Sequence, residues 1–357
     1  MKKILIINEF YNPFIGGMEI RYKRIADRLV SRGHEVDVMC IGHLNTLDKK
    51  ENIDGVNVNR VVLDPNHYKN GIFGRKISTM FKFYYGIKKE VKNKSYDIVI
   101  FGQFALVPMF FSKRILNKST TTFVDFVEYR FSFLWKLINK QIFKSTDKIS
   151  CISDNVRNVI LKKHKYLDPE KIITISNSVD MRDFKNLGDE YYLFIGRLEP
   201  HKNPDKAIKA VLGYNEKNPQ KAYPLHIVGD GVMFKELSEE YGENPMIIFH
   251  GFVSEQEKID IMSRGRLLVF PSDREGLPGV FVEAIGAEMP ILTTNSPNNN
   301  SKEFVIDEKI GEVTNRDIDS IIIGIEKIEN NRNRYLENIK AVKPKYDLEL
   351  TIKKFLS

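Results

Sequence analysis

Two glutamates, Glu275 and Glu283, stand eight positions apart in a stretch that reads Glu-Gly-Leu-Pro-Gly-Val-Phe-Val-Glu. The stretch follows an apolar run at 266–270 that is typical of a buried strand. Its glycines and proline predict a tight loop leading into a helix over 280–288, whose first N–H groups and positive dipole end attract anions. One carboxylate could face a sugar ring while the other accepts hydrogen bonds from a ribose diol. The pattern therefore predicts a sugar-nucleotide pocket, and the alternative is a surface loop with an exposed helix glutamate.

A second set of residues could grip a phosphorylated ligand. Arg197 and Lys202 follow the apolar stretch 191–195, so we expect them at the carboxyl edge of a sheet, where open α/β folds bind ligands. Arginine offers a planar fork and lysine a mobile point charge, and together they can clamp a diphosphate. Gly16 and Gly17 end another strand-to-helix turn, where their N–H groups can meet a phosphate. Solvated cations and a purely structural Gly-Gly turn are the alternatives.

Strands and helices alternate along the chain, which predicts an α/β fold with parallel sheets. Apolar runs predict strands at 3–8, 36–40, 97–101, 121–124, 148–152, 191–195, 225–228, 246–249, 267–270 and 291–293. Apolar residues at helical spacing predict a helix over 19–32 that Gly33 closes, and Ser254 with Glu257 has the spacing of a capping box. The sequence contains neither a P-loop nor the G-x-G-x-x-G fingerprint.

Length and composition indicate a globular protein of two domains. The chain has 357 residues, 42% of them apolar and 29% charged, and this length exceeds what one hydrophobic core usually supports. The sequence shows neither an apolar run long enough to span a membrane nor a signal-peptide pattern, so we expect a cytoplasmic protein. Its two cysteines, Cys40 and Cys151, lie in or beside apolar runs and are expected to pack there rather than form a disulfide or bind zinc.

Charge is distributed unevenly along the sequence. Residues 1–190 carry a net charge of +12 and residues 191–357 one of −4, which together give the +8 of the whole chain. The stretch 69–94 contains eight Lys and Arg but one acid, Glu90, and its apolar residues fall on one helical face. Such a helix can contact an anionic membrane surface, and the alternative is a helix that packs on the first sheet while its lysines are solvated. Because no nucleic-acid-binding motif accompanies the basic half, we expect no nucleic acid as a partner.

In order, these motifs resemble glycosyltransferase family 4 (glycosyl transferases group 1), the retaining glycosyltransferases of the GT-B fold. The resemblance covers nearly the whole chain and is carried by the segments 12–20, 32–36, 171–180, 195–202, 227–231, 250–253 and 275–283. It implies two Rossmann-like, doubly wound parallel-sheet domains facing a central cleft. The acceptor-binding domain would span 1–187, the nucleotide-sugar-binding domain 188–342, and a C-terminal helix over 343–357 would pack back on the first domain.

The resemblance also implies roles for single residues. Glu283 would hold the ribose hydroxyls and Glu275 the donor sugar. Family members often carry a histidine after a middle strand of the first domain, and we expect Asp125 to replace it here, with a strand-end or capping carboxylate as the alternative. The predicted catalytic residues are Glu275, Arg197, Lys202 and Asp125. The predicted donor-binding residues are Gly16, Gly17, Gly196, Arg197, Lys202, Val253, Glu275, Gly276, Leu277, Pro278 and Glu283.

The implied reaction is transfer of a hexosyl group from a nucleotide sugar to an acceptor hydroxyl with retention of the anomeric configuration. No cofactor and no metal are expected, and we interpret Asp317-Ile-Asp319 as a helix start rather than a metal site. We favour a UDP-sugar over a GDP-sugar as donor. As acceptor we favour an oligosaccharide or a lipid-linked glycan of surface polysaccharide synthesis, reached by peripheral binding to the inner face of the cell membrane. The alternatives are a sugar-nucleotide epimerase of the same fold and a non-catalytic nucleotide-sugar-binding protein.

Overall fold

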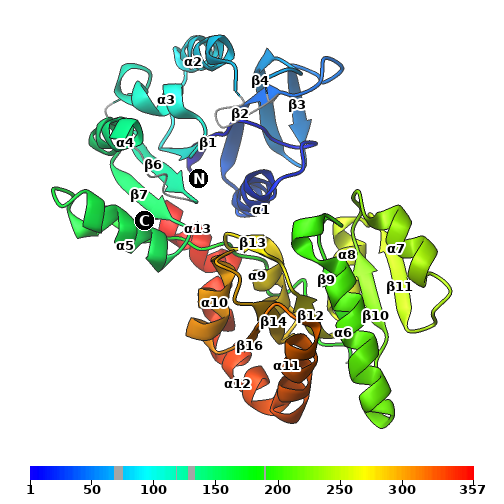
Figure 1. Ribbon diagram of the computed structural model, residues 1–357. Helices are drawn as coiled ribbons and strands as arrows, with labels where there is room; N and C mark the ends of the chain where they lie inside the picture. Colours follow the sequence, from blue (N-terminus) through cyan, green and yellow to red (C-terminus); the bar gives the residue numbers. More distant parts are fainter. Residues whose placement is uncertain (68–74, 118, 128–132, 189) are drawn as a thin grey trace. The chain divides into compact units, whose positions relative to one another are not determined.

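The computed structural model describes residues 1–67, 75–117, 119–127, 133–188 and 190–357, so residues 69–74 of the predicted basic stretch lie outside the described part (Figure 1). The described residues form two compact units. Unit 1 comprises Met1–Ser176 and Thr351–Ser357, and unit 2 comprises Asn177–Leu350. Each unit has its own largely parallel sheet, which confirms the predicted α/β class. None of the described helices combines the length and the apolar character that crossing a membrane requires.

Unit 1 is built on a sheet that has eight strands among the described residues, in the order β3-β4-β2-β1-β5-β6-β7-β8. These strands are β1 (Lys3–Ile7), β2 (Glu35–Gly42), β3 (Lys50–Ile53), β4 (Val56–Leu63), β5 (Ile98–Gly102), β6 (Thr121–Phe126), β7 (Lys148–Cys151) and β8 (Ile172–Thr174). Strand β3 runs antiparallel to β4, and the other neighbouring pairs are parallel. The helices are α1 (Gly17–Ser31), α2 (Ile77–Val91), α3 (Leu106–Phe110), α4 (Phe133–Ser145), α5 (Asp154–Lys163) and, from Thr351 on, the end of α13 (Leu348–Leu356); the 3-10 turns are η1 (Ser112–Arg114) and η2 (Pro169–Lys171).

The core of unit 1 follows from apolar strands covered by amphipathic helices. Strand β1 buries every residue after Lys3, as a central strand of a parallel sheet should. Helix α1 buries the apolar stripe that its sequence predicts, ends with Arg32 as C-cap, and is followed by Gly33 at a φ of 78°. Helix α2 buries Phe83 and Ile87 against the sheet. Cys40 and Cys151 are free and buried, so neither forms a disulfide.

Unit 2 contains a sheet that has six strands among the described residues, all parallel, in the order β11-β10-β9-β12-β14-β16. These strands are β9 (Tyr191–Ile195), β10 (Leu225–Val228), β11 (Ile247–Gly251), β12 (Gly265–Phe270), β14 (Ile291–Thr294) and β16 (Gly311–Thr314), and a separate parallel pair consists of β13 (Arg274–Glu275) and β15 (Asn298–Asn299). The helices are α6 (Pro204–Lys217), α7 (Phe234–Tyr241), α8 (Glu255–Met262), α9 (Gly279–Gly286), α10 (Ser301–Glu308), α11 (Ile318–Asn330), α12 (Arg332–Val342) and the start of α13; the 3-10 turns are η3 (Pro200–Lys202), η4 (Pro219–Lys221) and η5 (Lys343–Tyr346).

Several helix boundaries in unit 2 are fixed by local sequence. The Ser254 hydroxyl and the Glu257 carboxylate form the predicted capping box of α8. Asp317 caps α11 by accepting a hydrogen bond from the Ser320 N–H, which confirms it as a helix start. Helix α9 begins at Gly279 and ends at Gly286, two residues short of the predicted end, because Glu288 adopts the left-handed conformation with a φ of 57°.

The two units divide between Ser176 and Asn177, eleven residues before the predicted boundary between 187 and 188. The intervening segment carries Val179 and Phe184 into the core of unit 2, which is why it belongs there. At the other end of the chain, Tyr346 belongs to the same core, and residues from Thr351 on belong to unit 1. Within unit 1 the ring of Phe355 packs edge-on against Phe123, with 5.2 Å between their centres.

Candidate active site

The loops of unit 2 that carry the predicted site gather at one edge of its sheet. Strands β9, β10, β11 and β12 run parallel, so the segments that follow them lie at their shared carboxyl edge. These segments are 196–203, 229–233, 252–254 and 271–278. Every predicted site residue of unit 2 falls in them except Glu283, which lies in α9.

Two glycines hold the loop after β10 against the loop after β9. A Cβ at Gly229 would lie 2.0 Å from the carbonyl oxygen of Gly196, and one at Gly231 would lie 2.6 Å from that of Leu198. The φ of 133° at Gly229 also disfavours any residue with a side chain. The Leu198 N–H donates to the Asp230 carbonyl at 2.9 Å. Close backbone packing therefore fixes the turn that carries the predicted cations.

Lys202 and Glu275, both predicted from the sequence, meet in the structure. The Lys202 ammonium forms an ion pair with Glu275 Oε1, and the two side chains are only 13% and 11% exposed. The Ser272 hydroxyl donates to the same oxygen at 2.8 Å. The ammonium also lies 5.1 Å from the centre of the Phe270 ring, whose face attracts cations. This arrangement holds a cation and a carboxylate together just below the surface of the loops.

The backbone of Glu275 is held by a short sheet that the sequence analysis missed. Strand β13 pairs with β15, and the Asn300 N–H donates to the Glu275 carbonyl at 2.9 Å. Asn299 is fully buried, and its amide donates to the carbonyl oxygens of Ser272 at 3.2 Å and Thr294 at 3.0 Å. The only sequence signal for this anchor was the run of three asparagines at 298–300.

The loop between Glu275 and α9 leaves room beside free helix N–H groups. At Gly276 and Gly279, no described atom lies within 4 Å of where a Cβ would stand. Pro278 is the N-cap of α9, and no side chain of the described residues caps the helix there. The loop is tethered where the Asn177 amide donates to the Leu277 carbonyl at 3.2 Å. The first N–H groups of α9 are therefore placed to bind an anion.

Glu283 lies in α9 with its carboxylate nearly enclosed. Its Oε1 atom accepts from the Lys258 ammonium at 3.0 Å, and the same ammonium contacts Glu255 Oε2 at 2.8 Å. Lys258 was not among the predicted site residues, because it lies 25 positions from Glu283 and meets it only in the fold. The lysine compensates a buried carboxylate that would otherwise cost several kcal/mol.

Arg197 and Val253 differ in what they offer a ligand. The Arg197 side chain is exposed, and Arg197 lies two residues beyond β9. The Val253 side chain packs against the core of unit 2, whereas that of the neighbouring Phe252 is 72% exposed. Val253 therefore has chiefly its backbone groups to offer a ligand at this edge.

Gly16 and Gly17, the predicted phosphate-binding glycines of the first half, lie at the start of α1 in unit 1. A Cβ at Gly17 would meet no described atom within 4 Å. At Gly16 it would lie 2.4 Å from the carboxylate oxygen Oε2 of Glu19. Gly16 thus leaves room for the Glu19 carboxylate in its present position.

Asp125, the predicted replacement for the family histidine, lies inside unit 1 and is fully buried at the end of β6. Its Oδ2 atom accepts from Arg21 Nε at 2.9 Å and from the Tyr22 hydroxyl at 3.1 Å, and its Oδ1 atom accepts from the Ser150 hydroxyl at 2.7 Å. Arg21 also donates to the Ser176 carbonyl at 2.7 Å. Because both oxygens are occupied and enclosed, this geometry corrects the prediction that Asp125 faces a donor sugar and favours the structural alternative.

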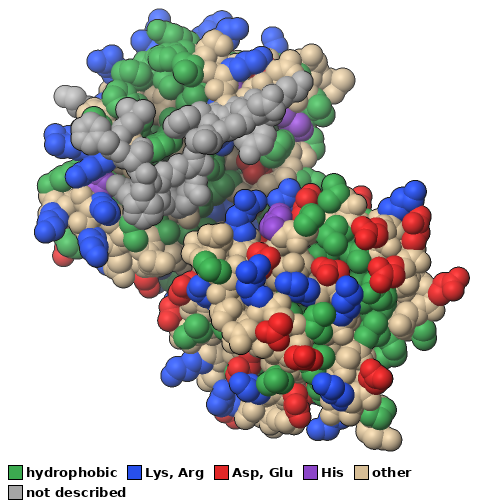
Figure 2. All heavy atoms as spheres, viewed as in Figure 1, with side chains coloured by type: hydrophobic (Ala, Val, Ile, Leu, Met, Phe, Trp, Pro, Cys, Tyr) green, Lys and Arg blue, Asp and Glu red, His purple; other side chains and the backbone are tan. Residues whose placement is uncertain are grey.

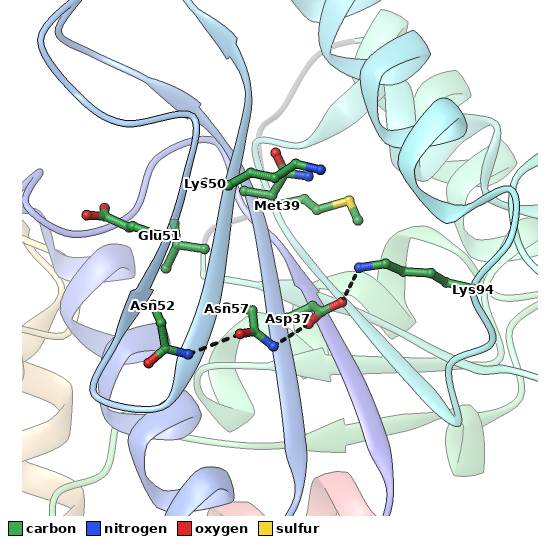
Figure 3. A pocket seen from close by; sticks show the side chains of 9 residues that line it. Asp37, Met39, Lys50, Glu51, Asn52, Asn57 and Lys94 are labelled. Atoms are coloured by element: carbon green, nitrogen blue, oxygen red, sulfur yellow. Dashed lines mark hydrogen bonds and ion pairs between the residues drawn. The ribbon is translucent and has the colours of Figure 1, made fainter.

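A pocket of about 340 Å³ lies elsewhere in unit 1 (Figure 3). It is lined by Asp37, Met39, Lys50, Glu51, Asn52, Asn57, Val58, Asn59 and Lys94. Figure 3 shows its polar groups linked in a chain, in which the Asn52 amide donates to Asn57, and both the Asn57 amide and the Lys94 ammonium donate to Asp37. Asp37 lies near the start of β2, and α/β sheets bind ligands at the opposite, carboxyl ends of their strands. The pocket is therefore not part of the candidate site.

Solved structures with the same fold place the chain in the GT-B class of two Rossmann-like domains. The Anabaena protein HepE, in complex with UDP and glucose, has a TM-score of 0.66 and 16% identity, covering 100% of this chain and 98% of that one. Two family models match consecutive parts of the sequence, Glycosyltransferase Family 4 over residues 15–183 and Glycosyl transferases group 1 over residues 180–344. The chain therefore belongs to glycosyltransferase family 4.

Two curated relatives are similar over long stretches. An alpha-1,3-galactosyltransferase of Escherichia coli, which transfers from UDP-Gal to alpha-D-GlcNAc-diphosphoundecaprenol, is 28% identical over 55% of this chain and 56% of its own length. An alpha-1,4-N-acetyl-D-galactosaminyltransferase of Campylobacter jejuni, named for an undecaprenol-linked acceptor, is 25% identical over 87% of this chain and 84% of its own. The chain thus aligns with little more than half of the E. coli protein.

Proposed function

We propose that this protein is a glycosyltransferase that moves a sugar from a nucleotide-sugar donor to an acceptor hydroxyl. Membership of glycosyltransferase family 4 supports the proposal. The observation that carries it is the composition of one sheet edge in unit 2, where the Lys202–Glu275 pair lies beside the open loop at 276–279 that leads into α9, the helix that carries the buried Glu283.

The donor would be held through three kinds of contact. Lys202 and the exposed Arg197, together with the N–H groups at the start of α9, would bind the diphosphate. Glu283 would accept hydrogen bonds from the ribose and Glu275 from the donor sugar. Charge that develops on the departing diphosphate would then meet cations that are already in position, which is worth about 3–4 kcal/mol for each such donor.

We further propose that the transfer retains the anomeric configuration and needs no metal ion. The support for retention is the family resemblance. The support for metal independence is that Arg197, Lys202 and the N–H groups at the start of α9 would together compensate the charge of a bound diphosphate. We favour UDP as the nucleotide because the E. coli relative is named for UDP-Gal.

We propose a lipid-linked glycan as acceptor, as in the names of the E. coli and C. jejuni relatives. The exposed face of α2 supports membrane binding by unit 1. Ile77, Phe81 and Tyr85 recur every four residues along this helix and are 71%, 44% and 63% exposed. Exposed lysines border this apolar row, namely Lys82, Lys88, Lys89 and Lys92. Figure 2 shows hydrophobic side chains gathered over α2 with Lys and Arg around them.

Such a face fits the interface of an anionic bilayer, because apolar side chains can enter the headgroup region while lysines bind the lipid charges. Each lysine near the surface contributes about 1 kcal/mol, so four of them give useful attachment that salt weakens. The attachment would be peripheral and would hold unit 1 at the surface where a lipid-linked acceptor is found.

The donor site is tested by measuring thermal stabilisation with a panel of UDP- and GDP-sugars. A ligand at about 100 times its dissociation constant should stabilise the folded protein by about 2.7 kcal/mol. We expect one nucleotide to stabilise the protein and Glu283→Ala to abolish the effect. If no nucleotide sugar or nucleoside diphosphate in the panel stabilises the wild-type protein, the proposed function is wrong.

The membrane face is tested by sedimentation with anionic and neutral liposomes at low and high salt. We expect binding to anionic liposomes at low salt, and loss of binding when lysines of α2 are replaced. The test variant changes Lys82, Lys89 and Lys92 to Glu, and the matched control changes exposed lysines of unit 2, Lys209, Lys217 and Lys221, to Glu. Equal binding by the two variants would show that α2 is not the membrane face.

A further inference from the structure

A cluster of polar side chains at the carboxyl edge of the sheet in unit 1 has no role in the donor site described above. It follows β1, where Asn8 and Glu9 are both buried. The Glu9 carboxylate accepts from Arg75 Nε at 2.5 Å and Arg75 Nη2 at 2.8 Å, and its Oε1 atom also contacts His67 Nε2 at 2.9 Å. The guanidinium carbon of Arg75 also lies over the Phe104 ring, 4.4 Å from its centre. Arg75 is therefore held firmly in one orientation.

Two polar atoms of this cluster are buried without a hydrogen-bond partner among the described residues, Asn8 Oδ1 and His67 Nδ1. Buried polar atoms are normally paired, and exceptions concentrate where water or a ligand completes the network. Gly102 leaves room for one of these two atoms, because a Cβ there would lie 2.2 Å from Asn8 Oδ1. The end of β5 thus leaves space for the unpaired oxygen.

Glu19 faces this cluster from the first turn of α1. Its carboxylate folds back over Gly16, whose missing side chain makes room for it. The pKa of Glu19 is raised to about 7, chiefly by burial and also by the nearby Glu9 carboxylate, while a hydrogen bond from its own backbone N–H, Asn8 and Arg75 act in the opposite direction. The charged groups that face Glu19 in the described structure are therefore Glu9, which follows β1, and Arg75, which precedes α2.

We propose that Glu19 binds the hydroxyl groups of a saccharide acceptor, with the Arg75–Glu9 pair beside it as the second polar contact. The inference rests on the proposed transfer reaction, since it names the surface of unit 1 on which the acceptor sugar would lie. An ionised carboxylate accepts hydrogen bonds from two hydroxyls. The Arg75–Glu9 pair beside it is neutral as a whole, which suits an uncharged sugar. Gly16 is then a positioning residue, because it lets the Glu19 carboxylate reach this place.

The charge state of Glu19 determines how the binding of an acceptor sugar should change with pH. Glu19 is ionised above about pH 7 and protonated below it, and only the ionised form offers both oxygens as acceptors. Binding of an acceptor sugar should therefore tighten as the pH rises through this range. Glutamine at position 19 keeps the shape but cannot ionise, so Glu19→Gln should bind weakly at every pH.

The test uses N-acetylglucosamine and N-acetylgalactosamine linked through diphosphate to a short polyprenyl chain. We expect Glu19→Gln to raise the acceptor KM by about 10- to 100-fold at about pH 8 and to abolish its pH dependence, while the dissociation constant of UDP stays unchanged. Arg75→Lys, which keeps the charge but loses the two-pronged contact with Glu9, should raise the same KM. Glu35→Gln, at the start of β2, is the matched control and should behave like the wild type.

An unchanged acceptor KM in Glu19→Gln, or an unchanged pH profile, would overturn the inference and leave the proposed function intact. If the wild-type protein transfers no sugar at all, the proposed function fails by itself. Binding of the same glycolipids is then measured by saturation-transfer NMR, which needs no turnover. Equal binding by wild type and Glu19→Gln, or binding by neither, would overturn the inference in that case.

Discussion

Replacing Asp125 with alanine should destabilise unit 1 strongly without touching the donor site of unit 2. The substitution leaves the Arg21 guanidinium buried without its carboxylate, because the Arg21 and Asp125 side chains are 3% and 0% exposed. Removing one partner of a buried ion pair typically costs about 3–5 kcal/mol. With a urea dependence of about 2 kcal/mol per molar, the unfolding midpoint should fall by about 2 M.

The chain offers a selective probe for this measurement. Its single tryptophan, Trp135, is buried in α4 of unit 1, so tryptophan fluorescence during urea unfolding reports on that unit. Asp48→Ala, at an exposed position of unit 1, is the control and should leave the free energy of unfolding within about 0.5 kcal/mol of the wild type. Arg21→Met combined with Asp125→Leu removes both charges and should recover most of the lost stability.

A loss below about 1 kcal/mol in Asp125→Ala, or a double variant as unstable as the sum of both single changes, would refute this account of the buried pair. If the stability were normal and transfer were lost, the catalytic role predicted from the sequence would be restored. The experiment therefore separates a structural carboxylate from one that faces the donor sugar.

Three further outcomes are expected. Transfer should survive EDTA, and complete loss of activity that magnesium or manganese restores would contradict metal independence. Gly229→Ala should abolish UDP binding and destabilise unit 2 by at least about 2 kcal/mol in urea unfolding followed by circular dichroism, because its Cβ would lie 2.0 Å from the Gly196 carbonyl oxygen, whereas Gly276→Ala should leave the same transition unchanged. Burial, and then the neighbouring His250, lower the pKa of His226 to about 4. The free energy of unfolding should therefore be at its maximum above about pH 6.5 and fall by about 1–2 kcal/mol toward pH 4, because the unfolded chain binds a proton that the folded one does not. His226→Phe should lose this dependence in thermal unfolding followed by near-ultraviolet circular dichroism, and a dependence equal to that of the wild type would exclude the histidine as its source.

The sequence predicted those parts of the fold that depend on neighbouring residues. The end of α1 at Gly33, the capping box at Ser254 and the Asp317 cap each depend on a few adjacent positions, and each was confirmed. The same holds for the parallel sheets, whose continuous apolar strands can be recognised one at a time.

Contacts between distant segments were not predictable in this way. Lys258 and Asn299 support Glu283 and Glu275, yet no spacing in the sequence links them to those glutamates. The predicted domain boundary lies eleven residues beyond the observed one, again because contacts between distant segments decide it. The sequence assigned residues 177–187 to the first domain, but Val179, Met181 and Phe184 pack into the core of unit 2, a contact that exists only once the fold has formed.

The central claim is that cations at the carboxyl edge of the second sheet stabilise the departing diphosphate of a sugar donor. It is tested most directly by following a labelled sugar from the stabilising nucleotide sugar into a lipid-linked acceptor, with wild type, Arg197→Ala and Lys202→Ala compared at equal folded concentration. The account predicts transfer by the wild type and a loss of about 100- to 1,000-fold in each variant. The urea midpoint should be unchanged in Arg197→Ala, whose side chain is exposed, and lower in Lys202→Ala, which leaves Glu275 without its partner. Transfer by both variants at the wild-type rate, or none by the wild type with any donor in the panel, would contradict it.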